Sequence, residues 1–183
     1  MSKTKRVGLN TYIPPFQYTT DNAAMIGIAG YYTKLASDRQ LVGWAMSNAT
    51  SQVAPARSSQ PMLGTNPFSV AIPNPGRFPI LIDMATSNVA YGKIEIAKRE
   101  KRDIPVGWAL NEKGEHTTNP FDIGGEKPYS MLPIGSLEEH GVHKGYCLCV
   151  MTDLLSGVLG DSAFGPFGPH FMLPESSPQP LFG

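Results

Sequence analysis

The chain has 183 residues, of which 41% are hydrophobic and 16% charged, and its 15 Lys and Arg residues balance 15 Asp and Glu. This length is enough for one domain with a core of its own. A net charge of zero leaves no electrostatic excess for binding nucleic acid or an anionic membrane, so we expect neither partner.

The predicted elements begin after an irregular lead. Residues 1–24 contain Pro, Thr, Asp and Asn without periodicity, and we expect them to be poorly structured. Apolar residues at helical spacing then predict a helix over 27–39. The apolar run at 41–47, which includes Trp44, predicts a strand.

Two further strands are predicted in the next part of the chain. The apolar runs 67–72 and 79–84 flank the sequence Pro-Asn-Pro-Gly at 73–76, which is typical of a turn between strands. Proline has no N–H to donate to a neighbouring strand, so it bounds both runs. Ser87 is a candidate cap for a helix over 87–101.

The last part of the chain contains one short strand and one long helix. Residues 107–110 predict the strand, and 119–135 read as a loop. A helix over 143–159 is predicted by apolar residues at helical spacing: Cys147, Val150, Met151, Leu154, Leu155 and Val158. The Gly- and Pro-rich stretch 166–183 reads as a tail. This mixture of helices and strands predicts an α/β layered domain with a mixed β-sheet flanked by helices.

The cysteines and the N-terminus bear on the compartment. Cys147 and Cys149 are too close in sequence for a disulfide framework, which favours buried thiols in a reducing compartment, the cytoplasm. No apolar segment of a secretory signal follows the basic N-terminus. The apolar stretch 145–160 is too short and too polar to cross a membrane.

Two residues stand where α/β proteins bind ligands. Asp83 ends an apolar strand just before a predicted helix, and ligands of α/β sheets lie beyond such strand ends. Lys144 precedes Gly145 at the start of the last helix, where a cation and free N–H groups can face one anion. The competing interpretations are a plain helix-capping role for Asp83 and a solvent-facing lysine at 144.

Other kinds of site have little support. The glycine-rich fingerprint of a Rossmann phosphate loop is absent from the sequence. His143 and Cys147 stand four residues apart on one helix face, but Cys149 points elsewhere, so we expect packed thiols and no metal site. Trp44 and Trp108 read as core residues.

Seven passages, in one order over residues 25–165, resemble the malate/L-lactate dehydrogenase family, which includes ureidoglycolate and sulfolactate dehydrogenases. Each passage alone is weak evidence, whereas seven in family order are specific. The passages are Gly-Ile-Ala-Gly-Tyr-Tyr (27–32), Leu-Gly-Thr-Asn-Pro (63–67), Asp-Met-Ala-Thr-Ser (83–87), Gly-Trp-Ala-Leu (107–110), Thr-Thr-Asn-Pro (117–120), His-Lys-Gly-Tyr (143–146) and Leu-Leu-Ser-Gly-Val-Leu (154–159).

The resemblance implies a fold and an activity. The fold is non-Rossmann and like that of L-sulfolactate dehydrogenase, and the protein is a homodimer. The activity is hydride transfer between NAD or NADP and a small 2-hydroxy or 2-oxo acid. The resemblance implies four cofactor-binding residues, because they fall on the family's cofactor-binding stretches: Asp83, Met84, Ala85 and Lys144. Thr65 and Asn66 fall on a loop near the substrate.

The chain also departs from the family. Met25 stands where the family has its catalytic His, and a thioether cannot transfer a proton near pH 7, so no catalytic residue is assigned. The family has a Ser or Thr whose hydroxyl contacts the cofactor, and this chain has Ala49 at that position. Thr50 or Ser51 would have to take its place. Residues 1–24 and 166–183 match nothing in the family, and we expect a member that is incomplete at both ends. The competing function is a non-catalytic remnant or binding module.

Overall fold

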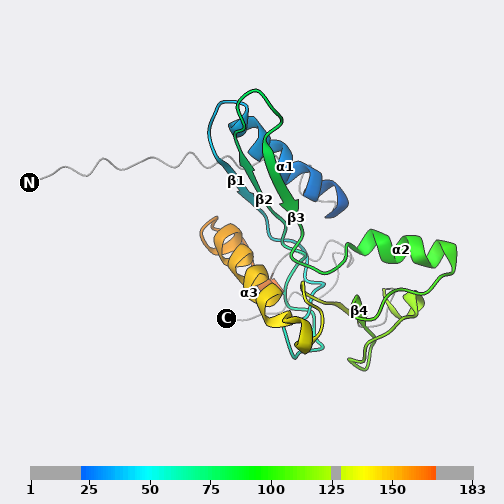
Figure 1. Cartoon of the computed structure of the whole chain (residues 1–183). Coiled ribbons are helices and arrows are strands. Elements are labelled where there is room, and N and C mark those ends of the chain that lie inside the picture. Colours follow the sequence, from blue (N-terminus) through cyan, green and yellow to red (C-terminus); the bar gives the residue numbers. More distant parts are fainter. Residues whose placement is uncertain (1–21, 125–128, 168–183) are drawn as a thin grey trace, which may run out of the picture.

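The computed structural model describes residues 22–124 and 129–167, with side chains from Ala29 onward. Helix α1 (Asn22–Ser37) packs on a sheet of three strands, β1 (Gly43–Met46), β2 (Phe68–Ile72) and β3 (Ile80–Met84). Helix α2 (Tyr91–Glu100) and the short strands β4 (Ala109–Leu110) and β5 (Ser130–Met131) form a second part of the molecule. Helix α3 (Val142–Asp153) lies below the sheet (Figure 1).

The three-stranded sheet has antiparallel pairing and two very different faces. β2 is central, and its Ser69 pairs with Ala45 on one side and Asp83 on the other. Since side chains alternate along a strand, this register places mostly small residues on the face toward α1. The opposite face, which we call the outer sheet face, is formed entirely of large apolar residues: Trp44, Met46, Phe68, Val70, Ile72, Ile80, Ile82 and Met84.

The small residues of the inner face allow α1 to approach closely. Gly43 of β1 lies against the backbone of α1, where a Cβ would come within 2.7 Å of the Thr33 Cα. The buried hydroxyls of Thr33 and Ser69 share a hydrogen bond at 2.8 Å, and Ser69 Oγ also lies 2.8 Å from the carbonyl oxygen of Ile82. A hydrogen bond between helix and sheet is therefore added to the backbone packing.

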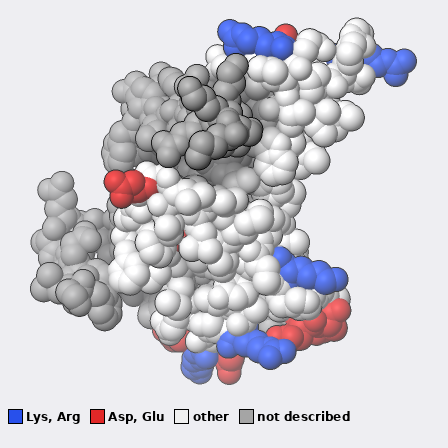
Figure 2. Space-filling view, turned by 90° about the vertical axis from the view of Figure 1, so that its left-hand side faces the viewer, with Lys and Arg blue, Asp and Glu red and all other residues white. Residues whose placement is uncertain are grey.

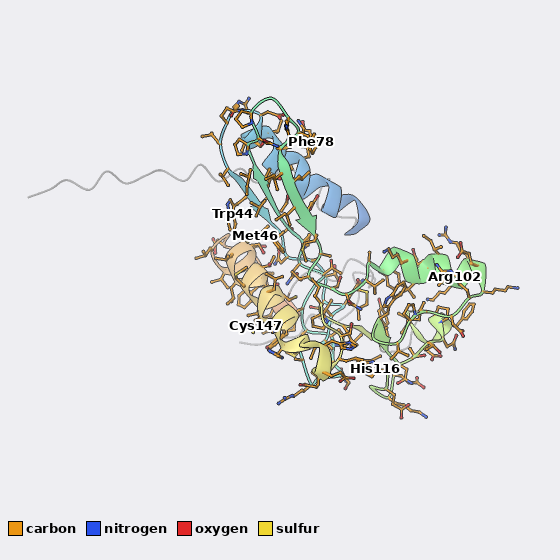
Figure 3. The ribbon with its side chains drawn as sticks, in the orientation of Figure 1. Trp44, Met46, Phe78, Arg102, His116 and Cys147 are labelled. Atoms are coloured by element: carbon orange, nitrogen blue, oxygen red, sulfur yellow. The ribbon has the colours of Figure 1, made fainter. Side chains whose placement is uncertain are left out.

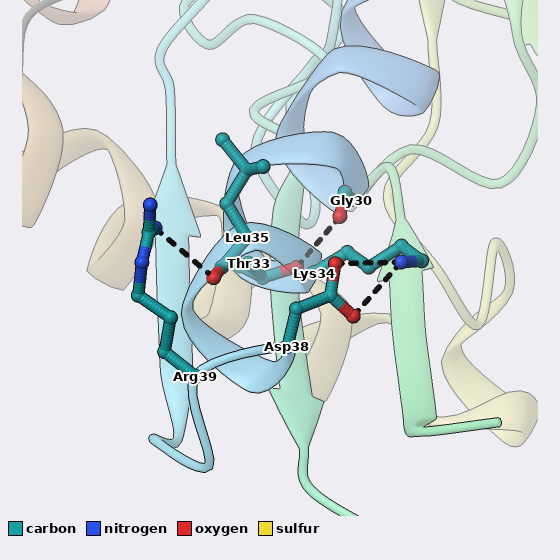
Figure 4. Close-up of polar contacts among 6 residues, drawn as sticks. All are labelled: Gly30, Thr33, Lys34, Leu35, Asp38 and Arg39. Atoms are coloured by element: carbon teal, nitrogen blue, oxygen red, sulfur yellow. Dashed lines mark hydrogen bonds and ion pairs between the residues drawn. The ribbon is translucent and has the colours of Figure 1, made fainter. Parts of the chain in front are cut away.

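The outward side of α1 carries polar side chains beside the exposed Tyr31 and Leu35. Lys34 and Asp38, four residues apart, form an ion pair at 2.7 Å, and Arg39 Nη1 donates to the carbonyl of Leu35 (Figure 4). Thr33, by contrast, donates to the Gly30 carbonyl within the helix. Exposed pairs of this kind contribute little stability, so α1 depends chiefly on its contact with the sheet.

The hydrophobic core lies in the second part of the molecule. Val53 pairs with Leu63 and with Met131, which connects the loop before β2 to β5. α2 packs its buried Ile94 and Ala97 into this region, against the 3-10 helix Pro120–Asp122. The buried cluster consists of Val53, Leu63, Val89, Ile94, Ala97, Ile104, Ala109, Ile123, Met131 and Cys149.

Helix α3 exposes most of the apolar residues that predicted it. It buries Val142, Gly145, Cys149, Thr152 and Asp153, which include its small and polar residues. A π-helical turn (Leu154–Val158) continues it. Five of the six predicted apolar residues, which we call the α3 stripe, are exposed: Cys147, Met151, Leu154, Leu155 and Val158. The sixth, Val150, is half-buried and packs against the core.

Several expectations need correction, although the α/β class is confirmed. The strands expected in one mixed sheet form two separate sheets with antiparallel pairing, and the parallel pairing among the described residues is the isolated bridge Val53–Met131. Ser87 caps no helix, because its hydroxyl bonds to the Val89 carbonyl and α2 begins at Tyr91. Trp44 is 66% exposed and lies outside the core.

Gly43→Ala tests the close packing of α1 on the sheet. We expect the free energy of unfolding to fall by about 1–3 kcal/mol, because the added methyl group meets backbone atoms of Thr33 that cannot move independently. Gly92→Ala in α2 is the control, since a Cβ there meets nothing within 4 Å and alanine favours helix by about 0.5–1 kcal/mol. Urea unfolding measures both, and an equal response would contradict the packing argument.

Candidate cofactor and substrate site

Asp83 joins the end of β3 to α1. Its Oδ2 accepts a hydrogen bond from the Gly30 N–H at 3.0 Å, and a Cβ at Gly30 would overlap this carboxylate. The last glycine of the motif Gly-Ile-Ala-Gly is therefore required, because any side chain at position 30 would collide with Asp83. Oδ1 of Asp83 is buried and has no hydrogen-bond partner among the side chains and backbone groups that the structure describes. Burial raises the pKa of Asp83 above its ordinary value, against the lowering effect of the Gly30 N–H.

The two residues after Asp83 are the last residue of β3 and the first residue beyond it. Met84 is the last residue of β3, opposite Phe68 on the outer sheet face, and Ala85 is half-buried. Thr86, which follows, is fully buried, and both its N–H and its hydroxyl donate to the Thr65 carbonyl. The backbone of the Asp-Met-Ala-Thr motif is therefore held at its C-terminal end by the Thr65–Asn66 loop.

Asn66 connects three segments of the chain. Its Oδ1 accepts from the Ala49 N–H at 3.0 Å, and its Nδ2 donates to the Cys149 carbonyl at 3.2 Å and to Asp153 Oδ1 at 3.1 Å. The side chain is fully buried, and its φ of 33° is a left-handed conformation that asparagine tolerates better than most residues. The structure thus places Asn66 inside the protein as a structural connection.

Two partners of Asn66 were not found from the sequence. Asp153 is buried and its Oδ2 accepts from the Gly165 N–H at 2.7 Å, while burial raises its pKa. Burial also raises the pKa of the Cys149 thiol to about 11, and this thiol contacts the Gly64 carbonyl. The sequence held one signal for this site, which is the charged Asp153 within an apolar stretch. A buried charge needs a polar partner, so Asp153 indicated that such a partner lies nearby.

Lys144 lies in the first turn of α3, and its side chain is exposed. The next residue, Gly145, packs so closely on Ile134 that a Cβ would overlap the Ile134 carbonyl. The Ile134 N–H donates to the Thr86 carbonyl at 3.0 Å. Ile134 therefore connects the first turn of α3 to the loop that follows Asp83, so the two predicted cofactor stretches lie on either side of one backbone segment.

The remaining candidates have other roles or lie outside the described side chains. Ser51 donates to the Gly165 carbonyl at 2.7 Å, so its hydroxyl is occupied by the protein. Met25 is on α1, ahead of the side chains that the structure describes. Cys147 is exposed, which corrects its expected burial. Within 22–124 and 129–167, no group of three metal-ligating side chains comes together, and no helix is long and apolar enough to cross a membrane.

The sequence profile of the family described as malate/L-lactate dehydrogenase matches residues 18–182. The chain belongs to this family. It is 45% identical over 141 residues to malate dehydrogenase of Pyrococcus abyssi, which covers 75% of this chain and 38% of the relative. It is 39% identical over 150 residues to a (2R)-3-sulfolactate dehydrogenase (NADP(+)) of Chromohalobacter salexigens, covering 81% of this chain and 42% of the relative.

Solved structures agree with this assignment. Malate dehydrogenase from Entamoeba histolytica matches with a TM-score of 0.69 and 33% identity, covering 75% of this chain and 39% of that one. Sulfolactate dehydrogenase from Methanocaldococcus jannaschii matches with a TM-score of 0.63 and 34% identity, covering 75% and 37%. The resemblance seen in the seven passages is thus confirmed, and the chain spans about 40% of the length of the curated relatives it matches.

Asn66→Asp tests the buried connection. The substitution replaces the amide donor with a carboxylate oxygen next to Asp153, and we expect the free energy of unfolding to fall by about 3 kcal/mol or more. Asn119→Asp is a matched control, because the exposed Asn119 amide also donates to an aspartate, Asp122. There we expect a loss below about 1 kcal/mol. Equal losses in urea unfolding would show that burial of Asn66 is unimportant.

Asp83→Asn tests whether the carboxylate destabilises the fold. Its amide oxygen can still accept from Gly30, and no charge remains to be buried, so we expect a higher urea midpoint than wild type at pH 7. Because the folded-state pKa of Asp83 is raised, the wild-type chain gains stability as the pH falls through that pKa, and the difference should shrink toward pH 4. A variant less stable than wild type at pH 7 would contradict this.

Proposed function

We propose that this chain forms part of a nicotinamide-dependent oxidoreductase that transfers hydride between a 2-hydroxy acid and the corresponding 2-oxo acid. Its family and the names of its relatives support this class of reaction. The observation that carries the proposal within the fold is Asp83, whose unpartnered, buried oxygen lies near the end of a strand in the matched motif. A charged acceptor kept without a partner costs stability, which is expected where a ligand supplies the donor.

The residues present fit a nicotinamide cofactor. When bound, NAD or NADP accepts or supplies the hydride. Asp83 Oδ1 would accept from a hydroxyl or amide of the cofactor, and the exposed ammonium of Lys144 would bind an anionic group such as a phosphate. Met84 and Ala85 would contribute backbone groups between them, held in place by the hydrogen bonds of Thr86 to Thr65.

Met25 favours a second candidate function. Reduction of a 2-oxo acid leaves an alkoxide that needs a proton, and a positioned acid contributes about 10²–10⁴-fold to the rate. The thioether of Met25 has no proton to give. His116 and His140 lie in none of the seven matched passages. The alternative is therefore a non-catalytic remnant or binding module that keeps the nucleotide site without the proton transfer.

The partners in this proposal follow from the same assignment. They are a small 2-hydroxy or 2-oxo acid and a second copy of the chain in a homodimer. The two cysteines are free, which suits a reducing compartment, and we propose the cytoplasm.

Nucleotide titration tests the proposal. We expect NADH or NADPH to bind with a dissociation constant in the micromolar to millimolar range, measured by nicotinamide fluorescence. Asp83→Asn and Lys144→Met should each weaken binding by about tenfold, as loss of a hydrogen bond to a charged group predicts. Lys93→Met, an exposed lysine on α2, should leave binding unchanged. Binding that is absent, or equally reduced in all three variants, would overturn the proposal.

Turnover separates the two candidate functions. NADH absorbance is followed with a panel of 2-oxo acids, with and without the chain. Enzyme-dependent oxidation near 1 s⁻¹ or faster would lie within the usual range of enzymes and favour the oxidoreductase. Nucleotide binding without turnover would favour the non-catalytic alternative.

A further inference from the structure

The face of the sheet that packs on α1 offers little apolar surface to hold the helix. The strand residues that alternate with the outer sheet face are mostly small: Gly43, Ala45, Ser69, Ala71, Leu81 and Asp83. The large side chains point the other way, as Trp44 and Met46 do in Figure 3. Among the described side chains of α1, the buried ones are also small: Ala29, Gly30, Thr33 and Ser37. Two surfaces with few large side chains interdigitate little, so apolar packing alone defines the position of α1 along the strands weakly.

Two buried hydroxyl groups define this position instead. Thr33 is 1% exposed and Ser69 is 0% exposed, and their hydroxyls share the hydrogen bond at 2.8 Å between helix and sheet. A hydroxyl has one proton, and Thr33 donates its own to the Gly30 carbonyl at 3.0 Å (Figure 4). Ser69 is therefore the donor of the shared bond. Its proton lies between two acceptors at 2.8 Å, which are Thr33 Oγ1 and the Ile82 carbonyl oxygen.

These contacts adjoin Asp83 from two sides. Ser69 is directly opposite Asp83 across β2 and β3, and the Cβ atoms of such pairs lie about 4.5–5.5 Å apart. Gly30, whose carbonyl accepts from Thr33, donates its N–H to Asp83 Oδ2 at 3.0 Å. Ile82, whose carbonyl lies next to the Ser69 hydroxyl, is the residue before Asp83. The chain of contacts thus starts at the Asp83 carboxylate, passes through α1 and β2, and returns to β3 beside Asp83.

Among the described residues, no ion pair holds Asp83. The salt bridges there join Lys34 to Asp38, Arg57 to Glu138, and Arg102 to Glu100. In Figure 2, most Lys, Arg, Asp and Glu side chains gather at the upper and lower ends of the view. The carboxylate is therefore placed by hydrogen bonds, which weaken steeply with distance and angle. A shift of α1 by about 1 Å away from Asp83 would take the Gly30 contact out of hydrogen-bond range.

We propose that Thr33 and Ser69 are positioning residues, whose hydroxyl pair fixes α1 on the sheet and thereby sets the orientation of the Asp83 carboxylate. The ligand in this inference rests on the proposed function, in which Asp83 binds a nicotinamide nucleotide. The positioning itself is a property of the fold and does not depend on the ligand. Neither hydroxyl needs to touch the nucleotide, because each acts through Asp83.

The pair acts on each carboxylate oxygen in a different way. By fixing α1, it keeps the Gly30 N–H on Oδ2. It also engages the proton of Ser69, the hydroxyl residue directly opposite Asp83, with Thr33 Oγ1 and the Ile82 carbonyl. Oδ1, buried without a partner among the described residues, is then left to accept from the nucleotide. A ligand group has to be held to within about 0.5 Å for such a contact to contribute fully.

A double-mutant cycle tests the proposal, with the dissociation constants of NADH and NADPH measured by nicotinamide fluorescence on the full chain. Thr33→Val removes the hydroxyl from a side chain of similar shape and should raise the constant about fivefold, as loss of one hydrogen bond predicts. Thr33→Ser keeps a hydroxyl and should return it to within about twofold of wild type. In an Asp83→Asn background, Thr33→Val should change it by less than about twofold, because residues that act through one group are not additive.

Thr152→Val is the matched control. Thr152 is also a fully buried threonine in a helix, and its hydroxyl donates to the Leu148 carbonyl at 3.0 Å, one turn back. It should leave nucleotide affinity unchanged. An equal loss of affinity in Thr33→Val and Thr152→Val would overturn the proposal. A full effect of Thr33→Val in the Asp83→Asn background would overturn it too.

Amide hydrogen exchange, measured without nucleotide, separates this inference from the proposed function. Thr33→Val should reduce the protection of the Gly30 N–H about fivefold more than its effect on global unfolding accounts for. The Ala97 N–H of α2 should follow global unfolding, which urea denaturation measures. If Thr33→Val loses its fold by circular dichroism, Ser69→Ala takes its place in both measurements, because it removes the partner hydroxyl.

The two measurements give distinct outcomes. A wild-type chain without nucleotide affinity would contradict the proposed function, and a selective loss of protection at Gly30 would still support the positioning role. Protection at Gly30 that changes only as much as at Ala97 would overturn the positioning role, whether or not the nucleotide binds.

Discussion

The buried amide of Asn66 is the interaction on which the arrangement of the segments depends. A primary amide has both donors and an acceptor, so one side chain can bond the backbone of Ala49, the backbone of Cys149 and the carboxylate of Asp153. Asp153 in turn holds Gly165. Because Cys149 and Asp153 are buried and Ala49 is half-buried, removing the amide would leave several of these groups unsatisfied at once. The loop before β2, helix α3 and the segment after it therefore keep their positions together.

This polar connection also explains why α3 exposes its apolar side. Satisfying Asp153 and Thr152 in the interior turns the opposite side, with Leu154 and Leu155, toward solvent. The sheet has a similar imbalance, since its small residues face α1 and its large ones do not. Apolar layers of α/β proteins are usually covered on both sides. The described part of the chain, which spans about 40% of its relatives' length, covers one side of the sheet.

Asp83 connects this architecture to the proposed chemistry. One carboxylate oxygen holds α1 through Gly30, and the other is buried without a hydrogen-bond partner among the described residues. A purely structural role would be served as well by asparagine, without the cost of burying a charge. Met25 stands on the same helix, α1, which packs on the sheet that carries Asp83.

The sequence by itself determined the family, the α/β class and the approximate positions of α1, the three main strands and α3, because apolar periodicity and turn residues act locally. It placed Asp83 near the end of a strand for the same reason. It did not predict the antiparallel pairing, the start of α2 at Tyr91 or the exposure of Trp44. Nor did it show that Asn66 and Asp153, 87 residues apart, share a buried hydrogen bond. These features depend on contacts between distant segments, and only the tertiary structure decides which face of a helix or strand finds a partner.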